Sequence, residues 1–208
     1  MIRGVYLVLD PAQTYGRLPV DVAEASLRAG ALVIQWRQKT GSLAERWSEI
    51  LAVRDLCRRH GVPFLINDRV DVALAVQAAG AHVGQDDLPV AAARQLIPGK
   101  LLGVSVSGLS EISAAEAAGA DYLGIGPIFP TPSKSDALPA VGLDVLYRAR
   151  LVTALPIVAI GGITLENAGR VKEAGADAVA VISAICGAPD LVAATRALTG
   201  VFEGMTIP

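Results

Sequence analysis

The chain has 208 residues, of which 52% are hydrophobic and 4% aromatic, and its 18 basic and 20 acidic side chains give a net charge of −2. Scattered basic residues without aromatic platforms argue against a nucleic-acid partner. The longest apolar stretch, around 151–163, is broken by proline and glycine and is too short for a membrane span, so we expect no membrane segment.

Short apolar runs recur along the chain, and we count eight. They lie at 4–9, 31–34, 64–66, 81–83, 101–104, just before Gly124, 157–160 and 179–182. The intervening segments, for example 43–59 and 165–174, have helical periodicity. Alternating strands and helices predict repeated βα units with a parallel sheet.

Glycine marks most of the expected boundaries between helix and strand. Ala-Gly-Ala occurs at 29–31, 79–81, 118–120 and 174–176, each time between an Ala-rich stretch and an apolar run. Since glycine commonly ends helices, we expect a helix C-terminus at each of the four sites.

Two folds accept this pattern. An open doubly wound sheet usually carries a glycine fingerprint after its first strand, whereas DPAQT follows at 10–14. A closed barrel gathers the end of every strand on one face. We therefore predict one (β/α)₈ TIM-barrel domain over residues 1–208.

Polar residues follow nearly every predicted strand, where one barrel mouth would collect them. The set comprises Gln35, Arg37, Lys39, Asn67, Asp68, Asp87, Ser105, Ser107, Gly161, Gly162 and Ser183. The loop after the sixth strand adds glycines, Thr131, Ser133 and Lys134, a composition that suits a phosphate. The alternative for this loop is a surface turn rich in proline and glycine.

The two carboxylates at this mouth predict a metal. Asp68 and Asp87 could each cap the following helix. Together, at the ends of adjacent strands, they fit a Mg²⁺ completed by water and a substrate phosphate. Arg37, Lys39 and Lys134 would add the charge that a diphosphate needs, although solvated surface charges are the alternative.

A second anion site is expected after the last two strands. TIM barrels often bind phosphate there, and this chain has Gly161 and Gly162 after the seventh strand and Ile182 and Ser183 after the eighth. The alternative role of the glycines is tight packing, and both roles can hold at once.

Histidine and cysteine are expected to play no chemical part. His60 precedes a turn on the opposite face of the barrel, and His82 lies within the fourth strand as a core residue, so neither is placed as a general base. Cys57 and Cys186 lack metal-ligand spacing and are expected to be unreactive thiols of a cytoplasmic protein.

An ordered set of motifs resembles the thiamine-phosphate synthase family over residues 6 to about 185. The motifs are QWRQK at 35–39, INDRVD at 66–71, HVGQDDLP at 82–89, GVS at 103–105, DYLGIGPIFPT at 121–131 and AIGGIT at 159–164.

The resemblance implies an enzyme that joins 4-amino-2-methyl-5-hydroxymethylpyrimidine diphosphate to 4-methyl-5-(2-phosphoethyl)thiazole and releases diphosphate. It assigns the pyrimidine diphosphate to Gln35, Arg37, Lys39, Asn67, Ser105 and Lys134. It assigns Mg²⁺ to Asp68 and Asp87, and the thiazole phosphate to Thr131, Ser133, Gly162, Ile182 and Ser183. Arg37, Lys39, Ser105 and Lys134 are the expected catalytic residues. A homodimer or homotrimer is also implied.

Four positions depart from the family pattern. This chain has Leu9 where the family frequently has Thr, Gln38 where it often has Glu, Ser107 where His is common and Ser133 where the loop usually has a second Thr. Ser133 keeps the hydroxyl, whereas Leu9 and Ser107 alter the expected edge of the pyrimidine pocket.

Two other functions fit part of the pattern. A thiazole tautomerase on the same barrel would move a proton and need neither diphosphate nor Mg²⁺, but such sequences typically lack the Asn-Asp pair and the Gln-x-Asp block kept here. A catalytically silent phosphate-binding regulator would not need the two carboxylates.

Overall fold

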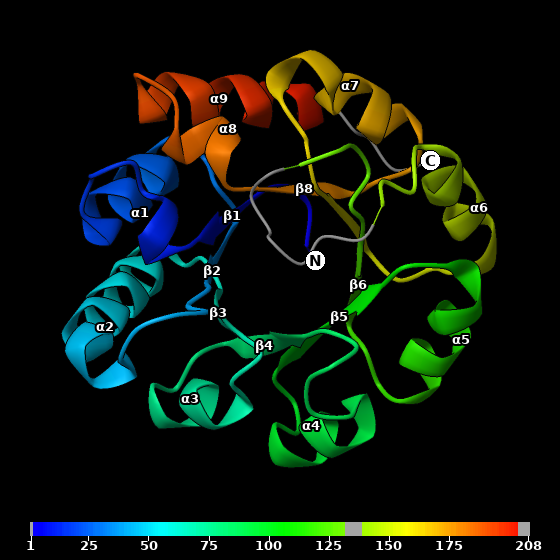
Figure 1. Ribbon diagram of the computed structural model, residues 1–208, viewed down its shortest axis with the longest axis horizontal. Coiled ribbons are helices and arrows are strands. Elements are labelled where there is room, and N and C mark those ends of the chain that lie inside the picture. The colour runs from blue at the N-terminus through cyan, green and yellow to red at the C-terminus, as the bar shows by residue number, and fades with distance from the viewer. Residues whose placement is uncertain (1, 132–138, 204–208) are drawn as a thin grey trace.

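A computed structural model describes residues 2–131 and 139–203. Within these residues, eight parallel strands close into a barrel, with β8 paired to β1, and helices surround it (Figure 1). The strands are β1 (Gly4–Leu9), β2 (Val33–Trp36), β3 (Phe64–Asn67), β4 (Gly80–Val83), β5 (Leu101–Val106), β6 (Tyr122–Ile125), β7 (Ile157–Ile160) and β8 (Ala178–Val181). The predicted (β/α)₈ barrel is confirmed.

Helices follow each strand, and most of them pack against the barrel. They are η1 (Pro11–Gln13), α1 (Pro19–Arg28), α2 (Leu43–His60), α3 (Val70–Ala75), α4 (Val90–Leu96), α5 (Leu109–Ala117), α6 (Asp144–Val152), α7 (Leu165–Glu173), α8 (Ser183–Cys186) and α9 (Leu191–Phe202). The short α8 and the longer α9 both follow β8, and α9 packs on β1 and closes the ring (Figure 1).

Continuous apolar strands form the core because both of their faces are covered. All six residues of β1 and all four of β2 and β8 are buried. Side chains directed into the barrel fill its lower part, and the polar ends of the strands lie together above them. The barrel therefore places most of the polar residues that follow the strands around one opening.

Three of the four Ala-Gly-Ala glycines end helices as expected. Gly30, Gly119 and Gly175 have φ of +97°, +93° and +102° after α1, α5 and α7. The expectation is wrong at Gly80, which lies inside β4, because the short α3 ends at Ala75. A Cβ on Gly80 would lie 1.8 Å from the Leu101 carbonyl oxygen, so close strand contact explains this glycine.

None of the helices in the two described ranges is both long and apolar enough to cross a bilayer. The free cysteines Cys57 and Cys186 are both buried, as expected. Burial raises the pKa of each thiol to about 12, so both are almost entirely protonated at neutral pH.

Candidate active site

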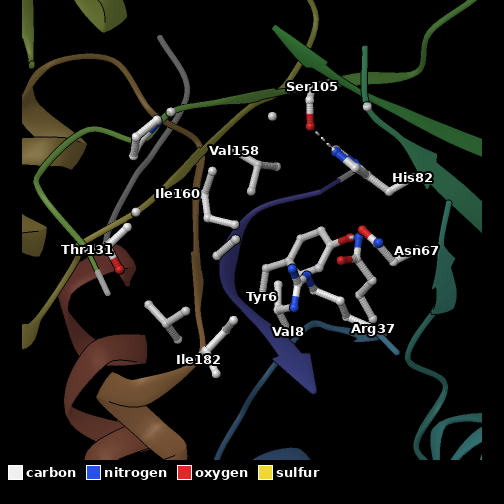
Figure 2. A pocket seen from close by; sticks show the side chains of 18 of the residues that line it. Tyr6, Val8, Arg37, Asn67, His82, Ser105, Thr131, Val158, Ile160 and Ile182 are labelled. Carbon is white, nitrogen blue, oxygen red and sulfur yellow. Dashed lines mark hydrogen bonds between the residues drawn. The ribbon is translucent and has the colours of Figure 1, made fainter. Parts of the chain in front are cut away.

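A cavity of about 510 Å³ opens at the carboxyl ends of the strands. All predicted site residues that the structure describes line it: Gln35, Arg37, Lys39, Asn67, Asp68, Asp87, Ser105, Thr131, Gly162, Ile182 and Ser183. In Figure 2, Arg37 and Asn67 lie on one side of the cavity, and Thr131 and Ile182 lie on the other. The remaining two predicted residues, Ser133 and Lys134, lie outside the described residues.

Arg37 is held by a carboxylate that the sequence reasoning missed. Arg37 Nη1 lies 2.5 Å from Asp10 Oδ2, and both residues are buried. Asp10 also accepts hydrogen bonds from the backbone N–H of Ala12 and from Gln13 Nε2. The solvated-surface alternative is therefore wrong for Arg37, whose guanidinium is fixed at the end of β2. An acidic residue directly after the first strand was the available signal.

Lys39, which follows β2, is paired with Asp68, which follows the neighbouring strand β3. Lys39 Nζ lies 2.6 Å from Asp68 Oδ2, and both side chains are partly exposed. Asp68 has φ of +62°, a left-handed conformation that costs energy for a residue with a Cβ and is found more often at functional sites. The strained backbone and the ion pair fix the position of this carboxylate.

Asp68 interacts with the second predicted carboxylate. Burial raises the pKa of Asp68, Lys39 opposes this rise, and the neighbouring Asp87 carboxyl adds to it. Asp87 Oδ2 accepts a hydrogen bond of 2.7 Å from the backbone N–H of Gly84, which holds the loop after β4. The two carboxyl groups thus share one partly desolvated region.

The capping alternative for these carboxylates is wrong. The N-cap residues of α3 and α4 are Arg69 and Pro89, and neither helix has a side-chain cap hydrogen bond. Asp68 and Asp87 instead line the cavity.

A polar chain that was not predicted crosses the floor of the cavity. Gln35 Nε2 donates to the Tyr6 hydroxyl at 2.7 Å, and the hydroxyls of Tyr6 and Tyr122 lie 2.9 Å apart. The Tyr122 hydroxyl is 2.9 Å from His82 Nδ1, and His82 Nε2 is 2.9 Å from Ser105 Oγ (Figure 2). His82 was expected to be a core residue with its hydrogen bonds satisfied: both ring nitrogens have partners, but the core position is wrong, because His82 is half-buried and lines the cavity.

The two tyrosines remain neutral in this network. Both are buried, and burial is the main cause that raises the pKa of each hydroxyl. A tyrosine within an otherwise apolar strand needs a hydrogen-bond partner when it is buried, which was the signal for Tyr6 and Tyr122 in the sequence.

The loop after β7 packs closely against the loop after β6. Gly161 and Gly162 have φ of +97° and +63°. A Cβ on Gly161 would lie 2.5 Å from Pro127 Cβ, and one on Gly162 would lie 2.6 Å from the Pro130 carbonyl oxygen. Tight packing, one of the two expected roles of these glycines, is confirmed. The close approach also brings residues of both loops to the cavity.

The positions that depart from the family pattern have different surroundings. Leu9 is fully buried in β1, whereas its neighbour Val8 lines the cavity. Ser107 lines the cavity as expected, and its N–H donates to Glu111 Oε2 at 2.7 Å. Gln38 Oε1 accepts from Trp36 Nε1 at 3.4 Å. Leu9 therefore affects the cavity only through packing.

Comparison with known proteins identifies the family. The family model described as thiamine monophosphate synthase matches residues 5–185. A thiamine-phosphate synthase from Chloroflexus aurantiacus is 54% identical over 194 residues, which cover 93% of this chain and 90% of that protein. A thiamine-phosphate synthase from Methanospirillum hungatei is 49% identical over 194 residues, which cover 93% of this chain and 94% of that protein.

A solved structure agrees with these sequence matches. The thiamine phosphate pyrophosphorylase of Pyrococcus furiosus superimposes with a TM-score of 0.88 at 38% identity, and the match covers 96% of this chain and 95% of that one. The predicted resemblance is confirmed, and the chain belongs to the thiamine monophosphate synthase family.

Proposed function

We propose that this protein is a thiamine-phosphate synthase. It transfers the pyrimidinylmethyl group of 4-amino-2-methyl-5-hydroxymethylpyrimidine diphosphate to the nitrogen of 4-methyl-5-(2-phosphoethyl)thiazole. The carbon–oxygen bond to the diphosphate breaks, and the leaving group takes the bonding electrons. The thiazole nitrogen lone pair then forms the new carbon–nitrogen bond. Family membership and one cavity with two polar ends together support this proposal.

The diphosphate occupies the side of the cavity formed by β2, β3 and β5. Gln35, Arg37, Lys39, Asn67 and Ser105 line this side, and Lys134 joins them in the proposal. Arg37 and Lys39 are already paired with the carboxylates of Asp10 and Asp68. The net positive charge of this side of the cavity is therefore smaller than the number of cations alone suggests. Arg37 therefore acts as a fixed donor with further N–H groups, since Asp10 contacts only one of its nitrogens.

Mg²⁺ is proposed to complete this subsite. Within the described residues, no three His, Cys, Asp or Glu side chains form a metal-binding group. Asp68 and Asp87 are its proposed protein ligands, since two carboxylates suit an ion that keeps several waters and binds phosphate oxygens. The interaction of these two carboxyl groups and the raised pKa of Asp68 fit a cation between them. When bound, Mg²⁺ supplies charge that stabilises the departing diphosphate.

The thiazole phosphate occupies the opposite side of the cavity. Thr131, Gly162, Ile182 and Ser183 line that side, and Ser133 is proposed to join them. Ser183 begins α8, so the first N–H groups of this short helix have no partner within it. Such backbone donors, with the hydroxyl groups, bind a phosphate without a metal ion.

The reaction needs no side-chain base, because the nucleophile is an unprotonated ring nitrogen. Catalysis then rests on stabilising the charge that develops on the leaving group. The chain holds the two substrates in one orientation and excludes water from the cation formed as the diphosphate departs.

Incubation with both substrates and Mg²⁺ tests the function. We expect thiamine phosphate and diphosphate as products, and neither when one substrate is omitted. Isomerisation of a thiazole phosphate without the pyrimidine substrate or metal would instead support the tautomerase alternative. Phosphate-ligand binding without turnover would support the regulator.

Two further expectations from the family resemblance are part of this proposal. A homo-oligomer is tested by light scattering of the purified chain. A cytoplasmic location is supported by the two buried free thiols, which suit a reducing compartment.

A further inference from the structure

The chain of hydrogen bonds on the cavity floor connects two proposed substrate-binding residues. It runs from Gln35 on β2 through Tyr6 on β1, Tyr122 on β6 and His82 on β4 to Ser105 on β5. Every link measures 2.7–2.9 Å. Five strands of the barrel are thus connected through side chains at the base of the site.

Neighbouring strands leave space for the rings of this network. A Cβ on Gly103 would lie 2.1 Å from Tyr122 Cζ and 2.4 Å from His82 Nδ1. One on Gly124 would lie 2.8 Å from His82 Cε1. Both positions therefore require glycine while the Tyr122 and His82 rings stay where they are. The network is a packed feature of the barrel, because any larger residue at these two positions would displace it.

The donor amide of Gln35 favours one direction for this chain of hydrogen bonds. Gln35 Nε2 donates to Tyr6, so the single hydroxyl proton of Tyr6 is available for Tyr122. We infer that Tyr122 in turn donates to Nδ1 of His82, which would place the imidazole proton on Nε2. In the opposite direction, the Tyr6 hydroxyl would accept hydrogen bonds from both Gln35 and Tyr122. The hydroxyl proton of Tyr6 would then have no acceptor in the chain.

The direction of the chain determines what Ser105 can do. With its proton on Nε2, His82 would donate to Ser105 Oγ, 2.9 Å away. A hydroxyl that accepts this bond keeps its own proton for another acceptor. Ser105 lines the cavity on the proposed diphosphate side, so this proton could be donated to the group on which negative charge develops.

We propose that His82 is a positioning residue that holds Ser105 as a hydrogen-bond donor to the departing diphosphate. The Tyr122, Tyr6 and Gln35 side chains keep His82 in the required tautomer. This proposal rests on the proposed function. His82 gives up no proton in the reaction; it acts by orienting the Ser105 hydroxyl before the diphosphate leaves.

Two substitutions at one position separate this role from a structural one. The amide of His82→Gln reaches the place of Nε2 and can still donate to Ser105, whereas the amide of His82→Asn reaches only the place of Nδ1. We expect His82→Asn to lower kcat about tenfold with little change in KM for the pyrimidine diphosphate. His82→Gln should recover most of this loss, and both variants should have similar melting temperatures.

A double-mutant cycle tests whether His82 acts through Ser105. In a Ser105→Ala background, His82→Asn should cause no further loss of kcat, because the group that it positions is gone. Equal losses of kcat in both backgrounds, or wild-type kcat for His82→Asn, would overturn the proposal.

The tautomer gives a readout that does not need activity. His60 and His82 are the only histidines of the chain, so ¹⁵N-histidine labelling gives two sets of ring signals. We expect a pyridine-type Nδ1 and a pyrrole-type Nε2 for His82, and a mixture for the exposed His60. Tyr122→Phe should shift His82 toward a mixture. A protonated Nδ1 on wild-type His82 would contradict the network, whether or not the protein is active. Failure to make thiamine phosphate would instead count against the proposed function.

Discussion

Arg37 on the edge of the cavity and Asp10 after β1 form a buried ion pair, with Nη1 and Oδ2 2.5 Å apart. Removing one partner leaves an unpaired charge away from water. We expect Asp10→Asn to lower the free energy of unfolding by about 3 kcal/mol or more, measured by urea denaturation. The double variant Asp10→Asn, Arg37→Gln should lose less than the sum of the single variants.

A matched control is available on the surface. Arg69 and Asp71 form an exposed pair of the same chemistry, also 2.5 Å apart. Arg69→Ala should change the free energy of unfolding by less than about 1 kcal/mol. Equal decreases in the free energy of unfolding for Asp10→Asn and Arg69→Ala would contradict the view that burial makes the Asp10–Arg37 pair more important.

Arg37→Lys tests the role of the guanidinium in catalysis. Lysine keeps the charge but loses the forked N–H groups that can contact Asp10 and a phosphate together. We expect kcat/KM for the pyrimidine diphosphate to fall at least about tenfold, since a charge-assisted hydrogen bond contributes roughly 1.5–3 kcal/mol. A wild-type kcat/KM for Arg37→Lys would show that the guanidinium has only a structural role.

Asp68 combines a proposed metal ligand with a strained backbone. Asp68→Ala should abolish most of the activity at saturating Mg²⁺, because one of two proposed carboxylate ligands is lost. Asp68→Gly should be equally inactive yet about 1 kcal/mol more stable than Asp68→Ala, since glycine accepts the φ of +62° without strain. Asp71→Ala is the control and should retain activity. Full wild-type turnover in excess chelator would argue against the metal.

Two glycines of the seventh βα unit should respond in opposite ways to alanine. Gly162→Ala would meet the Pro130 carbonyl oxygen and adopt φ of +63°, so we expect a loss of about 1–3 kcal/mol and weaker binding of the thiazole phosphate. Gly169 lies within α7 with open space around it, and Gly169→Ala should stabilise the fold by about 0.5–1 kcal/mol. Thermal unfolding of both variants, with calorimetry for the ligand, checks this contrast.

The two thiols should be inert and should affect stability only at high pH. Burial raises the pKa of Cys57 and Cys186 to about 12, above the value of about 8.5 for a free thiol. Thiol reagents should modify neither residue in the native protein at pH 7. As the pH rises past 8.5, the unfolded chain loses thiol protons first, so these groups lower the free energy of unfolding. Rapid labelling of native protein would refute this.

The barrel and most of the site could be predicted because their determinants are local. Each apolar run and the polar residue behind it are adjacent in sequence, and closure of the barrel brings the eight strand ends together. Asp68, Ser105 and Ser183 were found in this way. Ser133 and Lys134 remain predictions from the sequence alone.

The partners of these residues could not be predicted, since they depend on which side chains meet inside the closed barrel. Asp10 and Arg37 are 27 positions apart, and Tyr6 and Tyr122 are 116 apart. No local pattern specifies such pairs. The left-handed backbone of Asp68 is likewise visible only in three dimensions, and the half-buried place of His82 follows from the glycines on β5 and β6 beside it.

The most direct test of the account uses pyrimidine diphosphate labelled with ¹⁸O at the bridging oxygen between carbon and phosphorus. With the thiazole phosphate and Mg²⁺ present, we expect thiamine phosphate and diphosphate in equal amounts, with all the label in the diphosphate. Diphosphate released without thiamine phosphate, or label retained by the pyrimidine product, would contradict the proposed transfer.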